Sequence, residues 1–91
     1  MTGKQQLKEL LSKYNKIQIV REYRNKKSGV EYIDFMCNDA EYIASTQDMK
    51  NMRITTYVIT KGEYNVIYMG YGGKSLEATV ENIAKGRIKW V

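Results

Sequence analysis

Short connections between strand-like segments are the feature that most constrains this chain. The segments VEYIDFMC (30–37), ITTYVIT (54–60) and YNVIYMG (64–70) are rich in the β-branched and aromatic residues that strands prefer. Only a short turn around Lys61-Gly62 separates the last two segments. Parallel strands need a crossover of about a dozen residues, whereas a short turn joins antiparallel strands. The sequence therefore predicts an antiparallel meander.

A further strand is expected after Asn15, where the spacing of apolar residues changes to two. One face of this strand is predicted to carry Ile17, Ile19 and Tyr23, with Arg21 interrupting that face. The turn that follows, NKKSG, ends in a glycine that is free to adopt a positive φ. In the returning strand the residues predicted to share a face are Ile33, Phe35 and Cys37.

Residues 38–46 allow two interpretations. If Asn38-Asp39 is a two-residue hairpin turn, the apolar pairs on one face are Cys37 with Ala40, Phe35 with Tyr42, and Ile33 with Ala44. We favour this strand because all six residues are apolar and share one face. The alternative is a short helix capped by Asn38, with Glu41 at the capping-box position. The segment TQDMKNM (46–52) is predicted to be a polar loop or a single helical turn.

Two helices are predicted, one at each end of the chain. Residues 4–14 place apolar side chains at helical spacing, and Thr2 and Gln5 have the spacing of a capping box. Ser75 is expected to cap a second helix that runs to about Lys85 and stops before a glycine.

These elements define an α+β fold, an antiparallel meander sheet of four to five strands with an N-terminal and a C-terminal helix packed on one face. The length fits a single domain over residues 1–91. An uncovered sheet edge is a ready pairing site, so the fold allows a homodimer.

The net charge of +5 is unevenly distributed along the chain. Residues 1–27 hold eight basic and two acidic residues, whereas residues 28–84 hold four basic and eight acidic ones. Residues 85–91 add three more cations. This asymmetry predicts a cationic surface that meets an anionic partner, although lysine-rich surfaces also simply keep small proteins in solution.

Two groups of cations are the candidate nucleic-acid-binding residues. One lies in VREYRNKKSG (20–29) and the other in the C-terminal tail. Together with one tyrosine they are Arg21, Tyr23, Arg24, Lys26, Lys27, Lys85, Arg87 and Lys89. Arginine and lysine contact phosphates, and a tyrosine ring stacks on an unpaired base, so the combination predicts RNA or another polyanion as partner. If the tail lies beside the first hairpin, the two groups form one patch.

The segment GYGGKS (70–75) does not complete a nucleotide-binding loop. The pattern GxxxxGK[ST] requires a glycine at position 68, which is a tyrosine. The nearby glycines instead indicate a tight strand-to-helix turn. Because helix N-termini attract anions, Lys74 and Ser75 are a candidate anion site.

The sequence contains no histidine, which removes the commonest general base and most zinc sites. Cys37 lies in an apolar strand and is predicted to be a buried core residue. We therefore predict no catalytic residue, no metal and no cofactor. No apolar run is long enough to span a bilayer, and the N-terminus lacks the pattern of a secretory signal. A cytoplasmic location and no membrane partner are expected.

Tyrosines crowd the second predicted hairpin and its exit. They are Tyr57, Tyr64, Tyr68 and Tyr71. Tyrosine is common in protein interfaces, so these residues are a candidate docking surface. The alternative is cross-strand packing within the sheet.

The predicted function is a small non-enzymatic nucleic-acid-binding protein that contacts phosphates through the basic hairpin and the basic tail. RNA is favoured over duplex DNA because no predicted helix is basic along one face. The alternative is a small protein inhibitor, antitoxin-like or a phage counter-defence factor, which docks on a partner protein and can depend on RNA. A ribonuclease that uses Lys, Glu or Tyr is a third interpretation. Abundant Lys, Asn, Ile and Tyr, whose codons are AT-rich, suggest a bacterial or phage source.

Overall fold

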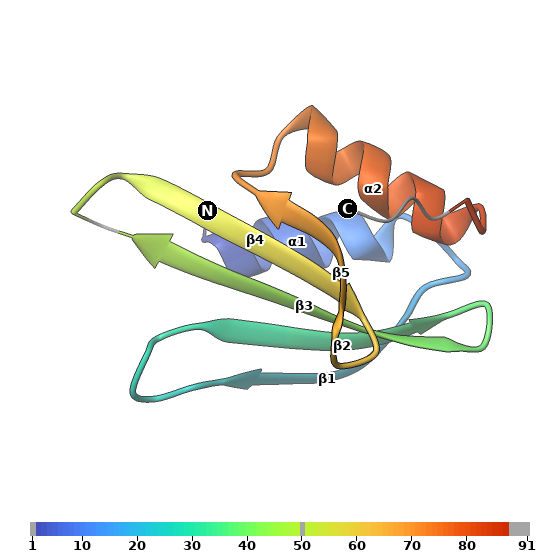
Figure 1. The fold of residues 1–91 in the computed structure, drawn as a ribbon, viewed down its shortest axis with the longest axis horizontal. Coiled ribbons are helices and arrows are strands. Elements are labelled where there is room, and N and C mark those ends of the chain that lie inside the picture. The colour runs from blue at the N-terminus through green and yellow to red at the C-terminus, as the bar shows by residue number, and fades with distance from the viewer. Residues whose placement is uncertain (1, 50, 88–91) are drawn as a thin grey trace.

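The strands lie across one sheet in chain order, β1-β2-β3-β4-β5, and every neighbouring pair is antiparallel. The computed structural model describes residues 2–49 and 51–87. Its elements are α1 (Gly3–Ser12), β1 (Gln18–Arg24), β2 (Glu31–Cys37), β3 (Ala40–Met49), β4 (Ile54–Lys61), β5 (Asn65–Gly70) and α2 (Lys74–Ala84). Both helices lie on one side of the sheet (Figure 1). The predicted α+β meander with a helix from each end of the chain is therefore confirmed.

The core lies between the helices and the sheet face that they cover, which we call the inner face. Helix α1 buries three leucines and α2 buries an apolar stripe of its own. The buried apolar residues of β2, β3, β4 and β5 are Ile33, Phe35, Cys37, Tyr42, Ala44, Tyr57, Ile59, Ile67 and Tyr68. Phe35 stacks on Tyr42 with ring centroids 5.1 Å apart. Removal of this apolar surface from water, about 25 cal/mol per Å², is what holds the two layers together.

The β2–β3 hairpin forms in the predicted register. Asn38 and Asp39 adopt φ values of 52° and 64°, the left-handed conformations that a tight two-residue hairpin turn requires. The three apolar pairs on the inner face are Cys37 with Ala40, Phe35 with Tyr42, and Ile33 with Ala44. The strand interpretation of residues 40–46 is thus confirmed, and the helix alternative is wrong.

Strand β3 is longer than the sequence suggests. It continues to Met49, which pairs with Ile54 of β4, so a loop or helical turn that starts at residue 46 is wrong. The polar residues remain in the ladder because β4 supplies their partners. Thr46 packs against the first turn of α1, and the Thr55 hydroxyl donates a 2.8 Å hydrogen bond to Asp48 Oδ1.

An extra residue in β1 changes the face that the second half of this strand presents. The pairing with β2 shifts between Ile19 and Arg21, so Val20 forms a β-bulge. Ile19 packs against the core, whereas Arg21 and Tyr23 turn to the opposite side of the sheet. The prediction that Tyr23 shares a face with the preceding isoleucines is therefore wrong, because the bulge inverts the alternation.

A second shift, in the pairing of β4 with β5, leaves Ile67 as an extra residue in β5. Both edge strands of the sheet are therefore interrupted by an extra residue. The pairings of β2 with β3 and of β3 with β4 contain no such shift.

The helix ends agree with the sequence prediction in part. Thr2 and Gln5 form the expected capping box at the start of α1. Helix α2 is capped by Gly73, with no side-chain cap, so the prediction that Ser75 caps it is wrong. The Ser75 hydroxyl instead contacts Tyr68. At the other end, Gly86 adopts a φ of 73° and terminates α2 as predicted.

Candidate functional site

The sheet face opposite the helices, called the outer face below, is left uncovered by the described part of the chain. Its side chains form rows across the strands, which follow from the strand register. From β1 to β5, one row is Arg21, Asp34, Ile43, Thr60 and Val66, and the next is Tyr23, Tyr32, Ser45, Val58 and Met69. Val20 and Met69 are 62% and 69% exposed, so large apolar side chains meet water on this face.

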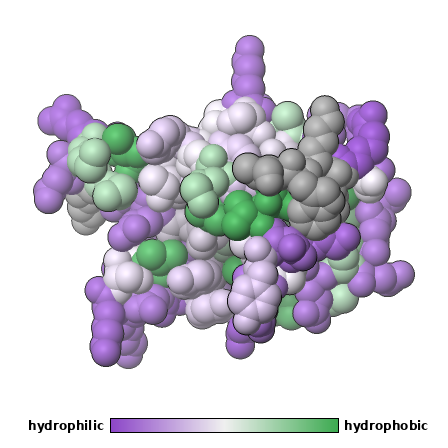
Figure 2. Space-filling view, in the orientation of Figure 1, coloured by the Kyte–Doolittle hydropathy of each residue, from purple (hydrophilic) through white to green (hydrophobic). Residues whose placement is uncertain are grey.

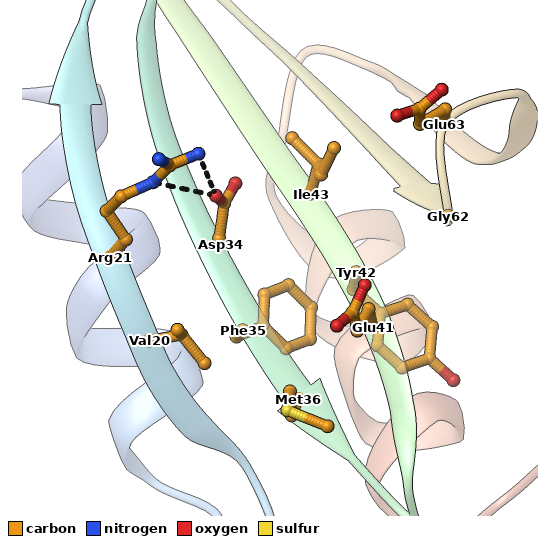
Figure 3. A pocket seen from close by; sticks show the side chains of 10 residues that line it. All are labelled: Val20, Arg21, Asp34, Phe35, Met36, Glu41, Tyr42, Ile43, Gly62 and Glu63. Atoms are coloured by element: carbon orange, nitrogen blue, oxygen red, sulfur yellow. Dashed lines mark hydrogen bonds and ion pairs between the residues drawn. The ribbon is translucent and has the colours of Figure 1, made fainter.

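A hollow of about 440 Å³ lies on the outer face between β1 and the turn that joins β4 to β5. Figure 3 looks into it from the outer side, with the helices behind the sheet. Val20, Met36 and Ile43 supply apolar side chains to its wall, and Gly62 and Glu63 of the turn close it. The volume falls within the roughly 300–1,000 Å³ that is usual for ligand-binding clefts.

The charged residues of this hollow are mainly acidic. They comprise one cation, Arg21, and the carboxylates of Asp34, Glu41 and Glu63, a net charge of −2 at neutral pH. Arg21 donates two hydrogen bonds to Asp34 Oδ2, of 2.9 Å from Nη2 and 3.2 Å from Nε. These bonds to the carboxylate raise the pKa of Arg21. Because Asp34 and Arg21 neutralise each other, the uncompensated charge belongs to the two glutamates.

Tyr23 is already in contact with three groups of its own sheet, one of them Asp34, whose Oδ1 accepts a 3.5 Å hydrogen bond from the Tyr23 hydroxyl. Its ring is stacked on Tyr32, with centroids 4.9 Å apart and planes inclined by 10°. The Arg21 guanidinium lies over the same ring, 4.5 Å from its centroid. Burial raises the pKa of the Tyr23 phenol, and the nearby Asp34 carboxylate adds to the effect. The ring is thus a less open platform for an unpaired base than the sequence suggests.

The described members of the two predicted basic groups lie at opposite ends of β2, so Lys85 and Arg87 do not form one patch with the β1–β2 turn. The first surrounds the β1–β2 turn, which precedes Glu31. The second follows α2, whose last turn lies beside the β2–β3 turn, since Asn38 Nδ2 donates a 3.4 Å hydrogen bond to the carbonyl of Ile83. In Figure 2 hydrophilic side chains project both at the lower left, over the β1–β2 turn, and at the right, where α2 ends.

The C-terminal group is also partly neutralised. Lys85 Nζ forms a 2.6 Å ion pair with Glu81, and this contact lowers the pKa of Glu81. Arg87 is exposed at the end of the described chain. Lys89 lies outside the described residues.

The β1–β2 turn retains a compact group of free cations. Arg24, Lys26 and Lys27 are exposed, and none forms an ion pair with a described residue. The Asn25 side chain orders the turn by accepting hydrogen bonds of 2.9 and 3.2 Å from the amides of Lys27 and Ser28. This turn is the part of the predicted nucleic-acid site that the geometry leaves available.

At the start of α2, the Ser75 hydroxyl of the candidate anion site is engaged by contacts within the chain. The Ser75 hydroxyl lies 2.8 Å from the Tyr68 hydroxyl and donates to the carbonyl of Gly72 at 3.0 Å. The Gly72 amide donates to Tyr68 at 3.1 Å. Lys74 is exposed beside this network. Ser75 is therefore unavailable to an incoming anion, whereas no described side chain caps the first-turn amides of α2.

The four tyrosines of the candidate protein interface divide into two pairs. Tyr57 and Tyr68 are buried in the core, and the Tyr57 hydroxyl donates a 2.9 Å hydrogen bond to Gln6 Oε1. Burial raises the pKa of Tyr57. Tyr64 and Tyr71 are 87% and 73% exposed and remain available to a partner.

Cys37 is a core residue, as predicted. It is 2% exposed, and its thiol lies 3.6 Å from the carbonyl of Ile83. Burial raises the pKa of this thiol, which keeps it in the unreactive protonated form.

Within residues 2–49 and 51–87, no cluster of three or more His, Cys, Asp or Glu side chains could hold a metal ion. None of the helices in that part of the chain is long and apolar enough to cross a membrane.

The hollow itself is not predictable from the sequence. In the sequence, no pattern relates the three carboxylates of the hollow, Asp34, Glu41 and Glu63. No local signal indicates that the β4–β5 turn lies beside β3. The alternation of β2 is the available signal, since it sends Met36 and Asp34 to the face opposite Phe35.

No protein-family model matches the chain, and neither the curated proteins nor the solved structures gave a match.

Proposed function

We propose that this protein acts by docking on a partner protein through the outer face of its sheet, as a small inhibitor does. The observation that carries the proposal is an uncovered face with a hollow of net negative charge and an exposed apolar side chain on each edge strand, Val20 on β1 and Met69 on β5. Large apolar side chains that face water on an uncovered sheet face fit a protein interaction site. Tyr64 and Tyr71 are further exposed rings that a partner can reach.

The charge of the outer face favours protein over nucleic acid as its partner. Phosphates would meet uncompensated carboxylates at the hollow, and the one arginine there is already bound to Asp34. The most exposed ring of the row, Tyr23, is in contact with Tyr32 and Arg21. A polyanion would therefore gain little from this face.

The test compares capture by variants that differ only in where a charge is added. Val20→Arg and Met69→Arg each place a cation on the outer face, and both positions are exposed enough to accept the longer side chain. Ala78→Arg adds the same charge to the exposed side of α2 and serves as the matched control. Each immobilised variant is mixed with nuclease-treated lysate from the native cells.

We expect the wild type and Ala78→Arg to capture the same partner, and both outer-face variants to lose it. The far-ultraviolet circular dichroism and melting temperature of all variants must match for the comparison to hold. Equal capture by all four proteins would refute the proposal. So would a partner that the wild type captures from untreated lysate but not from nuclease-treated lysate.

A second candidate, binding of single-stranded RNA at the β1–β2 turn, is favoured by one observation. Arg24, Lys26 and Lys27 are exposed and carry no ion pair to the described residues. Each phosphate neutralised on a single strand contributes about 0.7 to the salt slope, so three cations give a slope of about 2. Titration with an oligonucleotide at several salt concentrations tests this, with the double variant Lys26→Glu, Lys27→Glu as comparison.

RNA binding is refuted if affinity does not change with salt or is kept by the double variant. Cleaved oligonucleotide in the same titration would instead indicate a ribonuclease. The docking proposal is independent of this result, because the basic turn and the hollow are separate surfaces.

A further inference from the structure

We infer that the hollow on the outer face receives a lysine or arginine side chain of the partner protein. This inference rests on the proposed docking function and adds the chemistry that the partner must present. It follows from three properties of the hollow: two glutamates without ion pairs to the described residues, an apolar wall, and a backbone hydrogen bond between the elements that carry the glutamates.

The two glutamates are the groups that call for a cation. Neither Glu41 nor Glu63 forms an ion pair or a side-chain hydrogen bond with any residue in the described part of the chain. Asp34, by contrast, is engaged by Arg21 through two hydrogen bonds. An incoming ammonium or guanidinium therefore finds free acceptors on the two glutamates.

The backbone fixes the two glutamates relative to each other. The Gly62 amide donates a 2.9 Å hydrogen bond to the carbonyl of Glu41, which attaches the β4–β5 turn to β3. Gly62 adopts a φ of 68°, a left-handed conformation that glycine accepts without strain, and Glu63 follows it directly. The backbone segments that carry the two glutamates are thus held at one hollow before a partner arrives.

The wall of the hollow suits the stem of a long basic side chain. Val20, Met36 and Ile43 line it with aliphatic and thioether groups (Figure 3). Lysine and arginine pack their methylene stems on apolar surface while the charged head reaches polar partners. Methionine adapts its shape readily, so Met36 can close around stems of different length.

Other partner chemistries fit less well. An acidic side chain would bring a further negative charge to a hollow that already carries −2. A purely apolar segment would strip water from Glu41 and Glu63 and give them no partner in return. A basic side chain flanked by apolar residues satisfies both the charge and the wall.

A peptide-display selection on the immobilised full chain tests the inference without requiring the partner to be identified. Random peptides selected on the wild type are measured on two variants. Val20→Arg blocks the outer face, and the double variant Glu41→Gln, Glu63→Gln removes the charge while keeping the shape. The double variant Glu9→Gln, Glu77→Gln removes the same charge from exposed positions on the helices and is the matched control.

We expect selected peptides to share a lysine or arginine between apolar residues and to lose binding to Val20→Arg. Their affinity should fall about tenfold or more on Glu41→Gln, Glu63→Gln, the lower end of the effect measured for close interfacial charge pairs. Replacing the peptide cation by glutamine should cause the same loss on the wild type and no further loss on that double variant. Affinity for the helix control should not change.

Two results overturn the inference and leave the docking proposal standing. One is a set of peptides that bind the outer face, as judged by Val20→Arg, but lack a cation. The other is unchanged affinity on Glu41→Gln, Glu63→Gln. Peptides that bind Val20→Arg as well as the wild type would count against both proposals. A selection that enriches no peptide overturns the inference, while the capture experiment still decides the docking function.

Discussion

The inner and outer faces of the sheet are built from the same five strands, yet they use apolar residues in different ways. On the inner face Ile33 and Phe35 are at most 1% exposed and hold the helices to the sheet. On the outer face Val20 and Met69 are more than 60% exposed and hold nothing within the described chain. The comparison teaches that these two outer side chains bury little surface within the described chain and stay available to a partner.

The glutamates on the inner and outer sides of the sheet also differ in whether they form ion pairs. Glu22 emerges toward α1, where it meets Lys8 at 3.1 Å and Lys4 at 3.4 Å. These lysines lower the pKa of Glu22, chiefly through the contact with Lys8. Glu41 and Glu63 on the outer side have no such partner among the described residues. Ion pairs therefore tie Glu22 to α1 on the helical side, whereas on the outer side Asp34 is paired with Arg21 and the two glutamates are left uncompensated.

The largest expected contrast is the reactivity of a thiol on each face. Cys37 is buried, so it reacts only when the structure opens, which costs about 5 kcal/mol or more for a stable domain. The variant Met36→Cys, Cys37→Ala moves the thiol to the outer face, one residue away. We expect it to react with a soluble disulfide reagent over a thousandfold faster than the wild type, followed by absorbance. Similar rates would mean that the outer face is covered.

The next largest contrast is the loss of stability when a side chain on each face is truncated to alanine. Phe35→Ala removes a buried ring and is expected to lower the free energy of unfolding by about 3–5 kcal/mol. The neighbouring Met36→Ala should cost less than about 1 kcal/mol, because Met36 is only half-buried and no described element covers the outer face. Urea denaturation followed by circular dichroism measures both values. A loss at Met36 as large as that at Phe35 would break the comparison.

A smaller effect is expected where α1 approaches the inner face. A Cβ on Gly3 would lie 2.6 Å from Thr55 Cγ2 and closer still to Thr46 Oγ1. Gly3→Ala therefore forces the helix and sheet apart, at a cost of about 1–3 kcal/mol. Ser12→Ala, at an exposed position of the same helix, is the control and should be neutral. Thermal unfolding of the two variants compares them, and equal melting temperatures would contradict the close approach.

The smallest contrast concerns acid stability. Because the pKa of Glu22 is lowered in the folded state, its contribution is present above the unfolded pKa near 4.5 and is lost as the pH falls through the folded pKa. Glu22→Gln should therefore lower stability at pH 7 by about 0.2–1 kcal/mol, as for a partly exposed ion pair, and by nothing at low pH. Urea denaturation of the wild type and Glu22→Gln at a series of pH values from acid to neutral tests this, and a stability difference that stays the same at every pH would contradict it.

The sequence predicted best where a local pattern decides the structure. Asn38-Asp39 and the alternation around Phe35 were enough to set the β2–β3 register, because a shift by one residue would turn every apolar side chain to the wrong face. The Thr2 capping box was likewise predictable, since its two hydrogen bonds join residues three apart.

The predictions failed where the structure depends on a contact between residues that are far apart in the sequence. The bulge at Val20 has no local signal, and it sends Tyr23 to the outer face. Ser75 has the chemistry of a cap, but the Tyr68 hydroxyl reaches it from β5. The separation of the two basic groups depends on where α2 crosses the sheet, which the spacing of charges does not encode. The acidic hollow needs the β4–β5 turn beside Glu41, and that contact exists only in the folded chain.

The extra residues Val20 and Ile67 interrupt the outermost strands, whereas the central strands pair without a break. A straight row of free amides and carbonyls would act as a template on which further molecules add strand by strand into fibrils. The extra residue in each edge strand interrupts the straight row that such a template requires. We therefore expect concentrated solutions of this protein to resist fibre growth, and a second molecule to approach it broadside rather than by lengthening the sheet.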